Sequence, residues 1–239
     1  NSKRILLFTH FSPDPDALGS ITYLYNTLKS NTNAQICASI EGQIPSGLNF
    51  LEDFKNIYSK SALNHTVEFK PDLIIILDTN NFNRICKEQS SANDLREYIK
   101  QNNISTIILD HHPIVNNDQS SIFIHKETCC TTELLYLIFA KELGFKTTKE
   151  NNIAILTGIL ADTGRFVYNI TNYKRLFSIV EELLTEDISL EEIAYKIDRF
   201  KPDELIIISE LLKNLKQENN FNYSFLTPEF VKNQKVEES

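Results

Sequence analysis

The sequence predicts an α/β protein: a parallel β-sheet flanked by helices, followed by a helical connector and the start of a truncated second domain. Short apolar runs rich in isoleucine alternate with segments of helical periodicity in the first half of the chain. These runs show little period-two alternation, which is typical of strands buried on both faces of a parallel sheet. The second half is mostly helical in pattern. This order of elements favours a doubly wound sheet.

The predicted strands cover residues 5–9, 34–40, 73–77 and 106–109. Between them, apolar residues at helical spacing predict helices over 17–29 and 93–103. The later helices are predicted, from their periodicity and from caps at Thr131 or Thr132, Gly144 and Ser189, over 131–143, 150–161, 173–185, 189–200 and 202–217.

The last β-like run covers residues 221–227, and the sequence predicts no neighbouring strand for it to pair with. A polar tail follows it. One strand cannot bury itself, so we expect a second domain that is cut off. The resulting division is a main domain over 1–185, a helical connector over 186–217 and the beginning of a C-terminal domain over 218–239.

Composition narrows the class of protein. An apolar fraction of 41% allows an ordinary core, and the net charge of −8 argues against a long nucleic acid as the main partner. The longest apolar runs are too short to span a bilayer, so we expect no membrane partner. Four cysteines without a CxxC spacing indicate a reduced, cytoplasmic protein.

Carboxylates and imidazoles gather where the predicted strands end. The stretch THFSPDPDALGS places His10, Asp14 and Asp16 after the first strand, and IIILDTNN places Asp78 after the third. The fourth strand and the helix over 150–161 are followed by further residues of these types, namely Asp110, His111, His112 and Asp162. Ligands of open parallel sheets bind outside the carboxyl ends of the strands, so these side chains can converge.

Each of these residues also has an ordinary structural explanation. Ser12 or Asp16 could cap the following helix, and Asp78 could end its strand in an Asx-turn. Such roles explain any single residue but not the joint preference for metal-ligand types at these few positions. Carboxylates and imidazoles without thiols suit Mn²⁺ or Mg²⁺ first and Co²⁺ or Zn²⁺ next. Six ligands suit two ions that share a carboxylate, roughly 3.5–4 Å apart.

The motifs HFSPDPDALGS, LDTNN, LDHHP and ADTGRF resemble, in this order, the four motifs of the DHH phosphoesterase family. The resemblance covers about residues 5–170. It is strongest to the small stand-alone members with DHH and C-terminal DHHA1-type domains, which act on very short oligonucleotides, dinucleotides or 3′-phosphoadenosine 5′-phosphate. It implies an Mn-dependent phosphodiesterase or phosphatase for nanoRNA, pApA, cyclic di-AMP or 3′-phosphoadenosine 5′-phosphate, with a homodimer as a candidate assembly. A family II-like inorganic pyrophosphatase and a non-catalytic metal- or nucleotide-binding module are the alternatives.

The resemblance also implies a role for each motif residue. One ion would be held by His10, Asp14 and Asp78. The other would be held by Asp16, Asp78, His111 and Asp162, with Asp78 as the bridge. His112 would face the substrate phosphate, and Asp110 would orient a histidine. Arg84 and Arg165 could bind a phosphate or a base, or could equally be surface or ion-pair residues.

One feature of the family pattern is missing from this sequence. The family's C-terminal domain carries a glycine-rich GGGH-type loop for the substrate end, whereas the six glycines here do not cluster. We therefore expect residues 218–239 to be only the beginning of that substrate-binding domain.

Overall fold

The computed structural model describes residues 2–42, 45–51, 57–114, 121–200 and 202–234. The chain divides into two compact units, Asn1–Ile197 and Asp198–Ser239, which are described separately. The domain boundaries predicted near 185 and 217 stay predictions. In the described ranges, no helix has both the length and the apolar character needed to cross a bilayer.

The first unit is built on a parallel sheet, as the sequence predicts. Among the described residues the sheet has six strands in the order β3-β2-β1-β4-β5-β6, and every neighbouring pair is parallel. The four strands predicted over 5–9, 34–40, 73–77 and 106–109 belong to it. The strands are β1 (Arg4–Phe8), β2 (Gln35–Ile40), β3 (Ile57–Ser59), β4 (Leu73–Leu77), β5 (Ser105–Leu109) and β6 (Ser121–Ile124).

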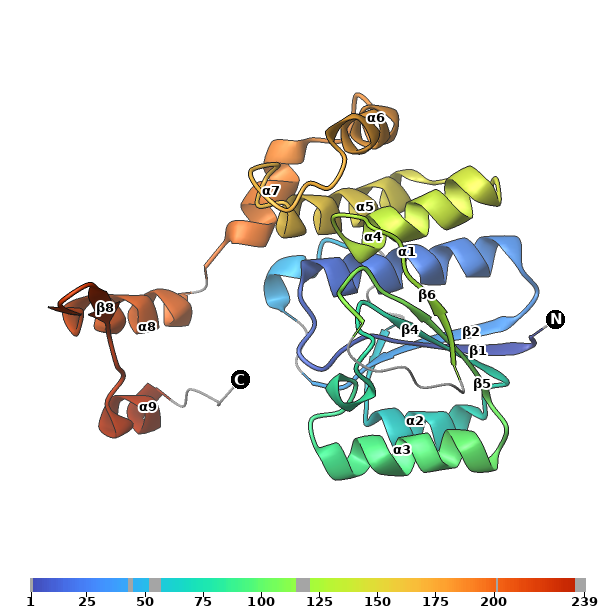
Figure 1. The fold of residues 1–239 in the computed structure, drawn as a ribbon, viewed down its shortest axis with the longest axis horizontal. Coiled ribbons are helices and arrows are strands. Elements are labelled where there is room, and N and C mark those ends of the chain that lie inside the picture. Colours follow the sequence, from blue (N-terminus) through green and yellow to red (C-terminus); the bar gives the residue numbers. More distant parts are fainter. Residues whose placement is uncertain (1, 43–44, 52–56, 115–120, 201, 235–239) are drawn as a thin grey trace. The chain divides into compact units, whose positions relative to one another are not determined.

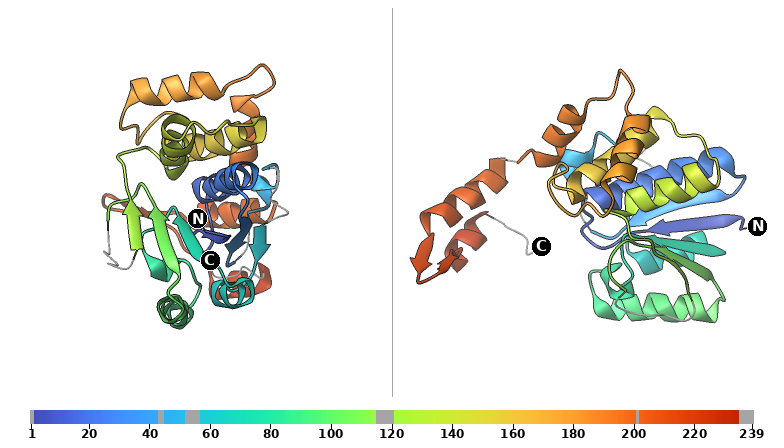
Figure 2. Two further views of the ribbon diagram at one scale, coloured as in Figure 1. Left: turned by 90° about the vertical axis from the view of Figure 1, so that its right-hand side faces the viewer. Right: turned by 45° about the horizontal axis from the view of Figure 1, so that its top comes forward.

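Helices cover both faces of this sheet (Figures 1 and 2). One face packs against α1 (Pro15–Asn31) and α4 (Thr131–Leu135), and α5 (Lys149–Asp162) packs on these helices. The other packs against α2 (Ala62–Phe69) and α3 (Gln89–Gln101).

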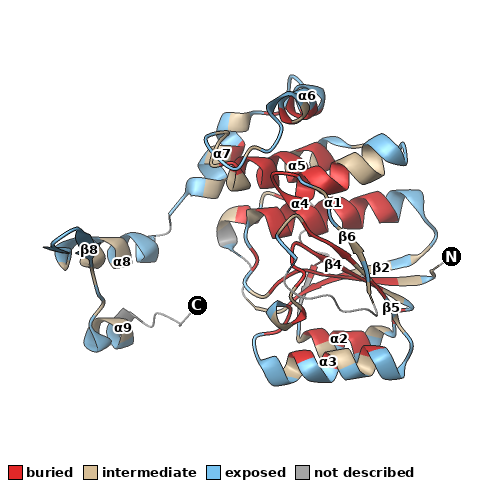
Figure 3. Cartoon of the chain, viewed as in Figure 1, coloured by how far each residue is buried: buried red, intermediate tan, exposed pale blue. Residues whose placement is uncertain are grey.

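Alternate residues of each central strand enter different cores. In β1, Leu7 belongs to the α1 side, whereas Leu6 and Phe8 belong to the α2 side. Both side-chain directions are therefore apolar, which explains why the sequence shows continuous apolar runs instead of alternation. Figure 3 shows the buried residues in the sheet and in α1 and α5, with the outer surface of α3 exposed.

The helices after residue 131 broadly follow the prediction. The predicted helix over 131–143 divides into α4 and a π-helical segment η4 (Tyr136–Glu142), and Gly144 follows with φ 71°. The predicted cap at Thr131 or Thr132 is wrong. Cys130 is the N-cap, and its Sγ accepts from the backbone N–H of Glu133 at 3.4 Å. Helices α6 (Tyr173–Leu183) and α7 (Leu190–Asp198) complete this unit, with short 3₁₀ turns at η1 (Ser46–Leu48) and η3 (Phe82–Arg84).

The second unit corrects the prediction of an unpaired strand. Helix α8 (Pro202–Lys213) ends before residue 217, and β7 (Lys216–Glu218) pairs antiparallel with β8 (Phe221–Tyr223). The turn between them uses Asn219 at φ 52°, a left-handed conformation that asparagine tolerates. The segment expected as a polar tail contains α9 (Pro228–Gln234).

Candidate metal centre

The predicted ligands lie at the point where the strand order of the sheet reverses. The chain runs outward from β1 to β3 and then returns to place β4 beside β1. At such a point the loops leaving two adjacent strands diverge and open a crevice at the carboxyl ends. Here the loop after β1 carries His10 and Asp14, and Asp78 directly follows β4.

His10, Asp14 and Asp78 form one group of candidate ligands. His10 Nε2 lies 3.7 Å from Asp14 Oδ2 and 3.6 Å from Asp78 Oδ2. Asp14 is also the N-cap of α1, because its Oδ1 accepts from the backbone N–H of Ala17 at 2.9 Å. The alternative in which Ser12 or Asp16 caps this helix is wrong. Asp14 caps with one oxygen and directs the other towards His10.

Asp16, His111 and Asp162 form a second group. His111 Nε2 lies 3.3 Å from Asp162 Oδ2, and Asp162 is the last residue of α5. Asp16 is fully buried and accepts from the backbone N–H groups of Thr131 and Thr132, at 2.7 and 3.0 Å. The first turn of α4 therefore holds this carboxylate in position.

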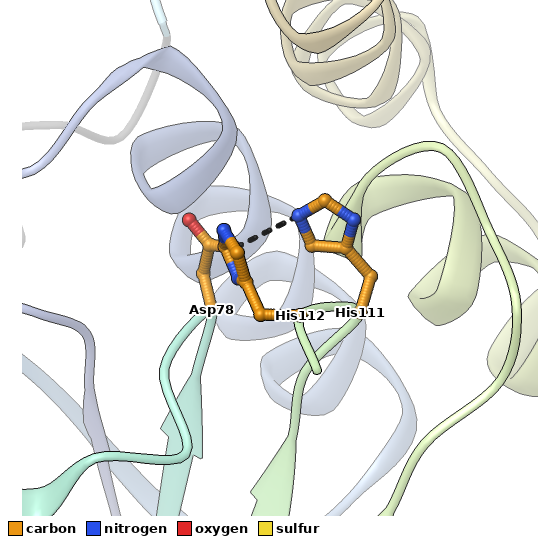
Figure 4. Close-up of side chains that lie close together, drawn as sticks. All are labelled: Asp78, His111 and His112. Atoms are coloured by element: carbon orange, nitrogen blue, oxygen red, sulfur yellow. Dashed lines mark ion pairs between the residues drawn. The ribbon is translucent and has the colours of Figure 1, made fainter. Parts of the chain in front are cut away.

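Asp78 belongs to the first group and lies beside the second. Its Oδ2 faces His10, whereas its Oδ1 lies 3.7 Å from both His111 Nε2 and His112 Nδ1 (Figure 4). The hydroxyl of Thr131 donates to Asp78 Oδ1 at 2.9 Å. Asp78 has φ 59°, an uncommon conformation for a residue other than glycine and one that Asp and Asn adopt most readily. Asp78 thus lies within reach of both groups, and its role as a shared ligand stays a prediction.

The carboxylates of the cluster repel one another electrostatically when no cation is bound. Burial raises the pKa of Asp78 to about 7, and the charge of Asp16 adds to the effect. Burial and the charges of Asp16 and Asp78 raise the pKa of Asp162 to about 9. Burial alone would lower the pKa of His10, but the neighbouring carboxylates of Asp14 and Asp78 raise it to about 10. Burial lowers the pKa of His111, which favours the neutral form that binds metals.

The donor set fits divalent cations. Asp78 Oδ2 and His111 Nε2 are buried and have no hydrogen-bond partner, an arrangement that is costly unless something else pairs with them. Divalent cations held by these residues would provide partners for such atoms and would offset the repulsion of Asp16, Asp78 and Asp162. Oxygen and imidazole donors without a thiol suit Mn²⁺, Mg²⁺ or Co²⁺.

His112 has a separate environment. Asp110 Oδ1 lies 2.8 Å from His112 Nδ1 and accepts from the His112 backbone N–H at 3.2 Å. Asn80 Nδ2 donates to the other oxygen of Asp110 at 2.6 Å. The hydrogen bond that His112 Nδ1–H donates to Asp110 raises the pKa of His112. Asp110 is therefore hydrogen-bonded to His112, and its role in orienting a histidine stays a prediction.

Arg84 and Arg165 lie near the cluster without entering it. Arg84 closes η3, its backbone C=O accepts from the Phe11 N–H, and its charge lowers the pKa of His112. Arg165 has φ 63° in the turn after Asp162. Their roles in substrate binding stay predictions, as do the individual roles of the other site residues.

Three residues that support the candidate metal centre were not predicted from the sequence. Thr131 and Asn80 hold Asp78 and Asp110 through hydrogen bonds, and nothing in their spacing sets them apart from ordinary polar residues. Gly158 gave a readable signal, because a glycine inside a helix often marks a close approach. A β-carbon there would lie 2.2 Å from Asp16 Oδ1.

A cavity of about 770 Å³ opens beside the cluster. It is lined by the imidazoles of both histidines and by residues from the two segments that flank Asp162 and α4, namely His111, His112, Pro113, Thr128, Cys129, Ala161, Asp162, Tyr168, Asn169, Ile170, Thr171 and Tyr173. Its volume lies within the roughly 300–1,000 Å³ that is usual for small-molecule sites.

Comparison with known proteins points in one direction. A family model described as "DHH family, N-terminal domain" matches residues 4–161. A Streptococcus mutans protein named "probable bifunctional oligoribonuclease and PAP phosphatase NrnA" is 28% identical over 216 residues, which are 90% of this chain and 63% of that protein. The Bacillus subtilis bifunctional oligoribonuclease and PAP phosphatase NrnA is 26% identical over 174 residues, 72% of this chain and 50% of that protein. The chain thus spans between half and two thirds of the length of these relatives.

A similar structure is also known. The crystal structure of an exopolyphosphatase-related protein from Bacteroides fragilis superposes with a TM-score of 0.82 at 27% identity, over 98% of this chain and 68% of that one.

Proposed function

The chain belongs to the DHH family, whose N-terminal domain matches residues 4–161, and on this premise we propose that it is a two-metal-dependent phosphoesterase for short nucleotides. The proposed substrates are short oligonucleotides (nanoRNA), dinucleotides such as pApA and cyclic di-AMP, and 3′-phosphoadenosine 5′-phosphate. The observation that carries the proposal is the cluster of carboxylates and imidazoles around Asp78 at the switch point of the sheet, of which His111, His112 and Asp162 line a cavity. The names of the Streptococcus and Bacillus relatives support the same chemistry.

Two divalent ions, Mn²⁺ first and Mg²⁺ or Co²⁺ next, are proposed for the two groups. His10, Asp14 and Asp78 would hold one ion, and Asp16, Asp78, His111 and Asp162 the other. When bound, such ions supply the positive charge that activates water and offsets charge on phosphoryl oxygens. Thr131 and the first turn of α4 keep Asp78 and Asp16 in place for this task.

His112 is proposed to act on the substrate phosphate. Its Nδ1 is engaged by Asp110, so Nε2 is the nitrogen left for the ligand. The hydrogen bond that the ring donates to Asp110 raises the pKa of His112 and so favours the protonated ring. In that form Nε2–H can donate to a phosphoryl oxygen or transfer its proton to the leaving ribose oxygen. Asn80 fixes Asp110 and therefore contributes indirectly.

A short substrate agrees with the electrostatics of the chain. A net charge of −8 leaves little basic surface for a long phosphate backbone, which proteins bind through many Lys and Arg contacts. Arg84 and Arg165 are proposed to contact a terminal phosphate or a base. Residues 218–239 are proposed as the beginning of a substrate-binding domain, and a cytoplasmic location is proposed from the four free cysteines.

An inorganic pyrophosphate or polyphosphate is the second candidate substrate, because the similar Bacteroides structure is described as exopolyphosphatase-related. The same metal cluster could serve it, since both reactions displace an oxygen from phosphorus. The two candidates differ in whether the substrate carries a nucleoside.

A substrate panel tests the proposal. It contains pApA, cyclic di-AMP, 3′-phosphoadenosine 5′-phosphate, pyrophosphate and a long oligonucleotide, each incubated with Mn²⁺ or with a chelator. We expect Mn²⁺-dependent turnover of the short nucleotides and a large loss of kcat in His112→Ala. Preferred turnover of pyrophosphate would favour the second candidate. Tight binding without turnover would indicate a non-catalytic module, and equally fast cleavage of the long oligonucleotide would contradict a short substrate.

A further inference from the structure

We infer that Tyr168 and Tyr173 form a nucleobase-binding wall of the cavity beside the metal centre, so that this site selects phosphate esters that carry an aromatic base over inorganic phosphates. The inference rests on the proposed function and names the part of the substrate that these two residues recognise.

Both tyrosines line the same cavity as His111 and Asp162. A ligand whose phosphate lies at these metal-centre residues can therefore place its remaining atoms against the two rings. Within the described part of the chain, the lining contains no lysine or arginine. A ligand that is only phosphate would find few partners there beyond the metal end, whereas a flat apolar ring would find two aromatic side chains.

The ring of Tyr168 is held in place and remains accessible. It packs over Gly164, where an added β-carbon would lie 2.2 Å from Tyr168 Cε1, and Gly164 has φ 54°. Only glycine combines this backbone conformation with room for the ring. The side chain is nevertheless 56% exposed, which leaves surface for a ligand to cover.

The turn that carries Tyr168 is fastened to the metal centre. The backbone N–H groups of Val167 and Tyr168 both donate to the Thr163 carbonyl, at 2.8 and 3.0 Å. Asn169 Nδ2 donates to the backbone C=O of Asp162 at 3.2 Å. These bonds hold the backbone of the turn that carries Tyr168 close to Asp162.

Tyr173 is positioned from the other side of the same segment. It is the first residue of α6 and stacks on Phe177, with ring centroids 6.4 Å apart and an angle of 27° between the rings. Arg175 ties this helix to the cavity, because its Nε donates to the buried Glu133 at 2.7 Å and its Nη2 donates to the Glu127 carbonyl at 2.8 Å. The wall is thus built on a supported helix end.

Aromatic side chains are general platforms for bases, since every base has a π-face. Loss of one stacking ring weakens nucleotide binding by roughly five- to a hundredfold. Because stacking needs a ring on the ligand, the effect should vanish for a ligand without one. This difference separates a base-binding wall from a merely structural tyrosine.

Isothermal titration of the 239-residue chain in the presence of Mn²⁺ tests this directly. We expect adenosine 5′-monophosphate to bind the parent protein roughly five- to a hundredfold more tightly than ribose 5-phosphate. Tyr168→Ala should remove most of that preference, and Tyr168→Phe should keep it because the ring is retained. Tyr195→Ala, at an exposed tyrosine of α7 outside the cavity, is the matched control and should change neither affinity. Equal affinities in the parent protein, or an unchanged preference in Tyr168→Ala, would overturn the inference.

Steady-state kinetics separates this inference from the proposed function. If the parent protein hydrolyses pApA with Mn²⁺ and Tyr168→Ala keeps the same KM, the wall is wrong and the proposed function stands. If no nucleotide is hydrolysed while adenosine 5′-monophosphate still binds through Tyr168, the proposed function is wrong and the wall stands. A raised KM for pApA, with kcat nearly unchanged, would support both.

Discussion

Replacing Asp78 by asparagine should stabilise the metal-free protein while abolishing its response to metal. The carboxylate is 1% exposed, and burial together with the charge of Asp16 raises its pKa from 3.8 to about 7. At about pH 8 the folded chain must therefore keep an unfavourable charge in place. Asparagine removes that charge, can still accept from the Thr131 hydroxyl, and tolerates the backbone at φ 59°.

The magnitude follows from the change in pKa. The pKa of Asp78 rises by about three, and each pKa unit corresponds to 1.36 kcal/mol of free energy, so the upper value is about 4 kcal/mol. Asp16 shares the same repulsion and can take up a proton in place of Asp78, so we expect about 2–4 kcal/mol. For a unit of this size, that gain raises Tm by roughly 5–15 °C.

Thermal unfolding followed by circular dichroism, at about pH 8 with a chelator or with millimolar Mn²⁺, measures both effects. Without metal, Asp78→Asn should melt above the parent protein. With Mn²⁺ the parent protein should gain stability and the variant should not, because a neutral amide is a poor shared ligand. Asp94→Asn, at an exposed position of α3, is the matched control and should behave like the parent. A metal-free variant that melts at or below the parent temperature would refute the reasoning, as would equal stabilisation of both proteins by Mn²⁺.

Three further predictions concern the same centre. The metal-free chain should lose stability as the pH rises from about 5 to about 9, because folding raises the pKa of Asp78 to about 7 and that of Asp162 to about 9. A group whose pKa is raised by folding stabilises the folded state only below that pKa. A melting temperature that rises over this pH range in chelator would contradict the prediction. Thr131→Val should lower the affinity for Mn²⁺ roughly 10–100-fold, because it removes a hydrogen bond to the candidate ligand Asp78, and should change the Tm in chelator little. Titration calorimetry with Mn²⁺ measures the affinity, and an unchanged value would refute the prediction. Gly158→Ala should lower the free energy of unfolding in chelator by about 1–3 kcal/mol and weaken Mn²⁺ binding, because the new methyl group would clash with Asp16. An unfolding curve in urea that matches the parent protein would contradict this, since it would show that the helix can shift to make room.

The sheet was predictable because its central strands are buried on both faces. The runs that became β1 and β4 needed no turn or partner to identify them, since continuous apolar residues of that length are typical of such strands. The edge strands were harder. β3 has only three residues, too few to show a period, and β6 has four residues that are half-buried or exposed rather than buried on both faces.

The hairpin in the second unit escaped for a different reason. β7 has the sequence KQE, which is polar, fully exposed and indistinguishable from the end of a helix. Its strand conformation depends on pairing with β8, and pairing is a tertiary property that propensity does not contain.

The proximity of the candidate ligands could be predicted from the sequence, but the hydrogen bonds that hold them in place could not. Because parallel strands end at one edge, residues such as Asp78 and His111, which follow β4 and β5, had to come together. That Asp16 is held by the N–H groups of Thr131 and Thr132 depends on how α4 packs beside α1. Such contacts join residues more than a hundred positions apart, and no local spacing announces them.

The most direct test of the central claim is a crystal structure of the protein grown with Mn²⁺, with anomalous diffraction recorded at the manganese absorption edge. The account predicts two anomalous peaks, one contacting His10, Asp14 and Asp78 and the other contacting Asp16, His111 and Asp162, with Asp78 touching both. No peak among these side chains, or manganese bound only elsewhere on the chain, would contradict it.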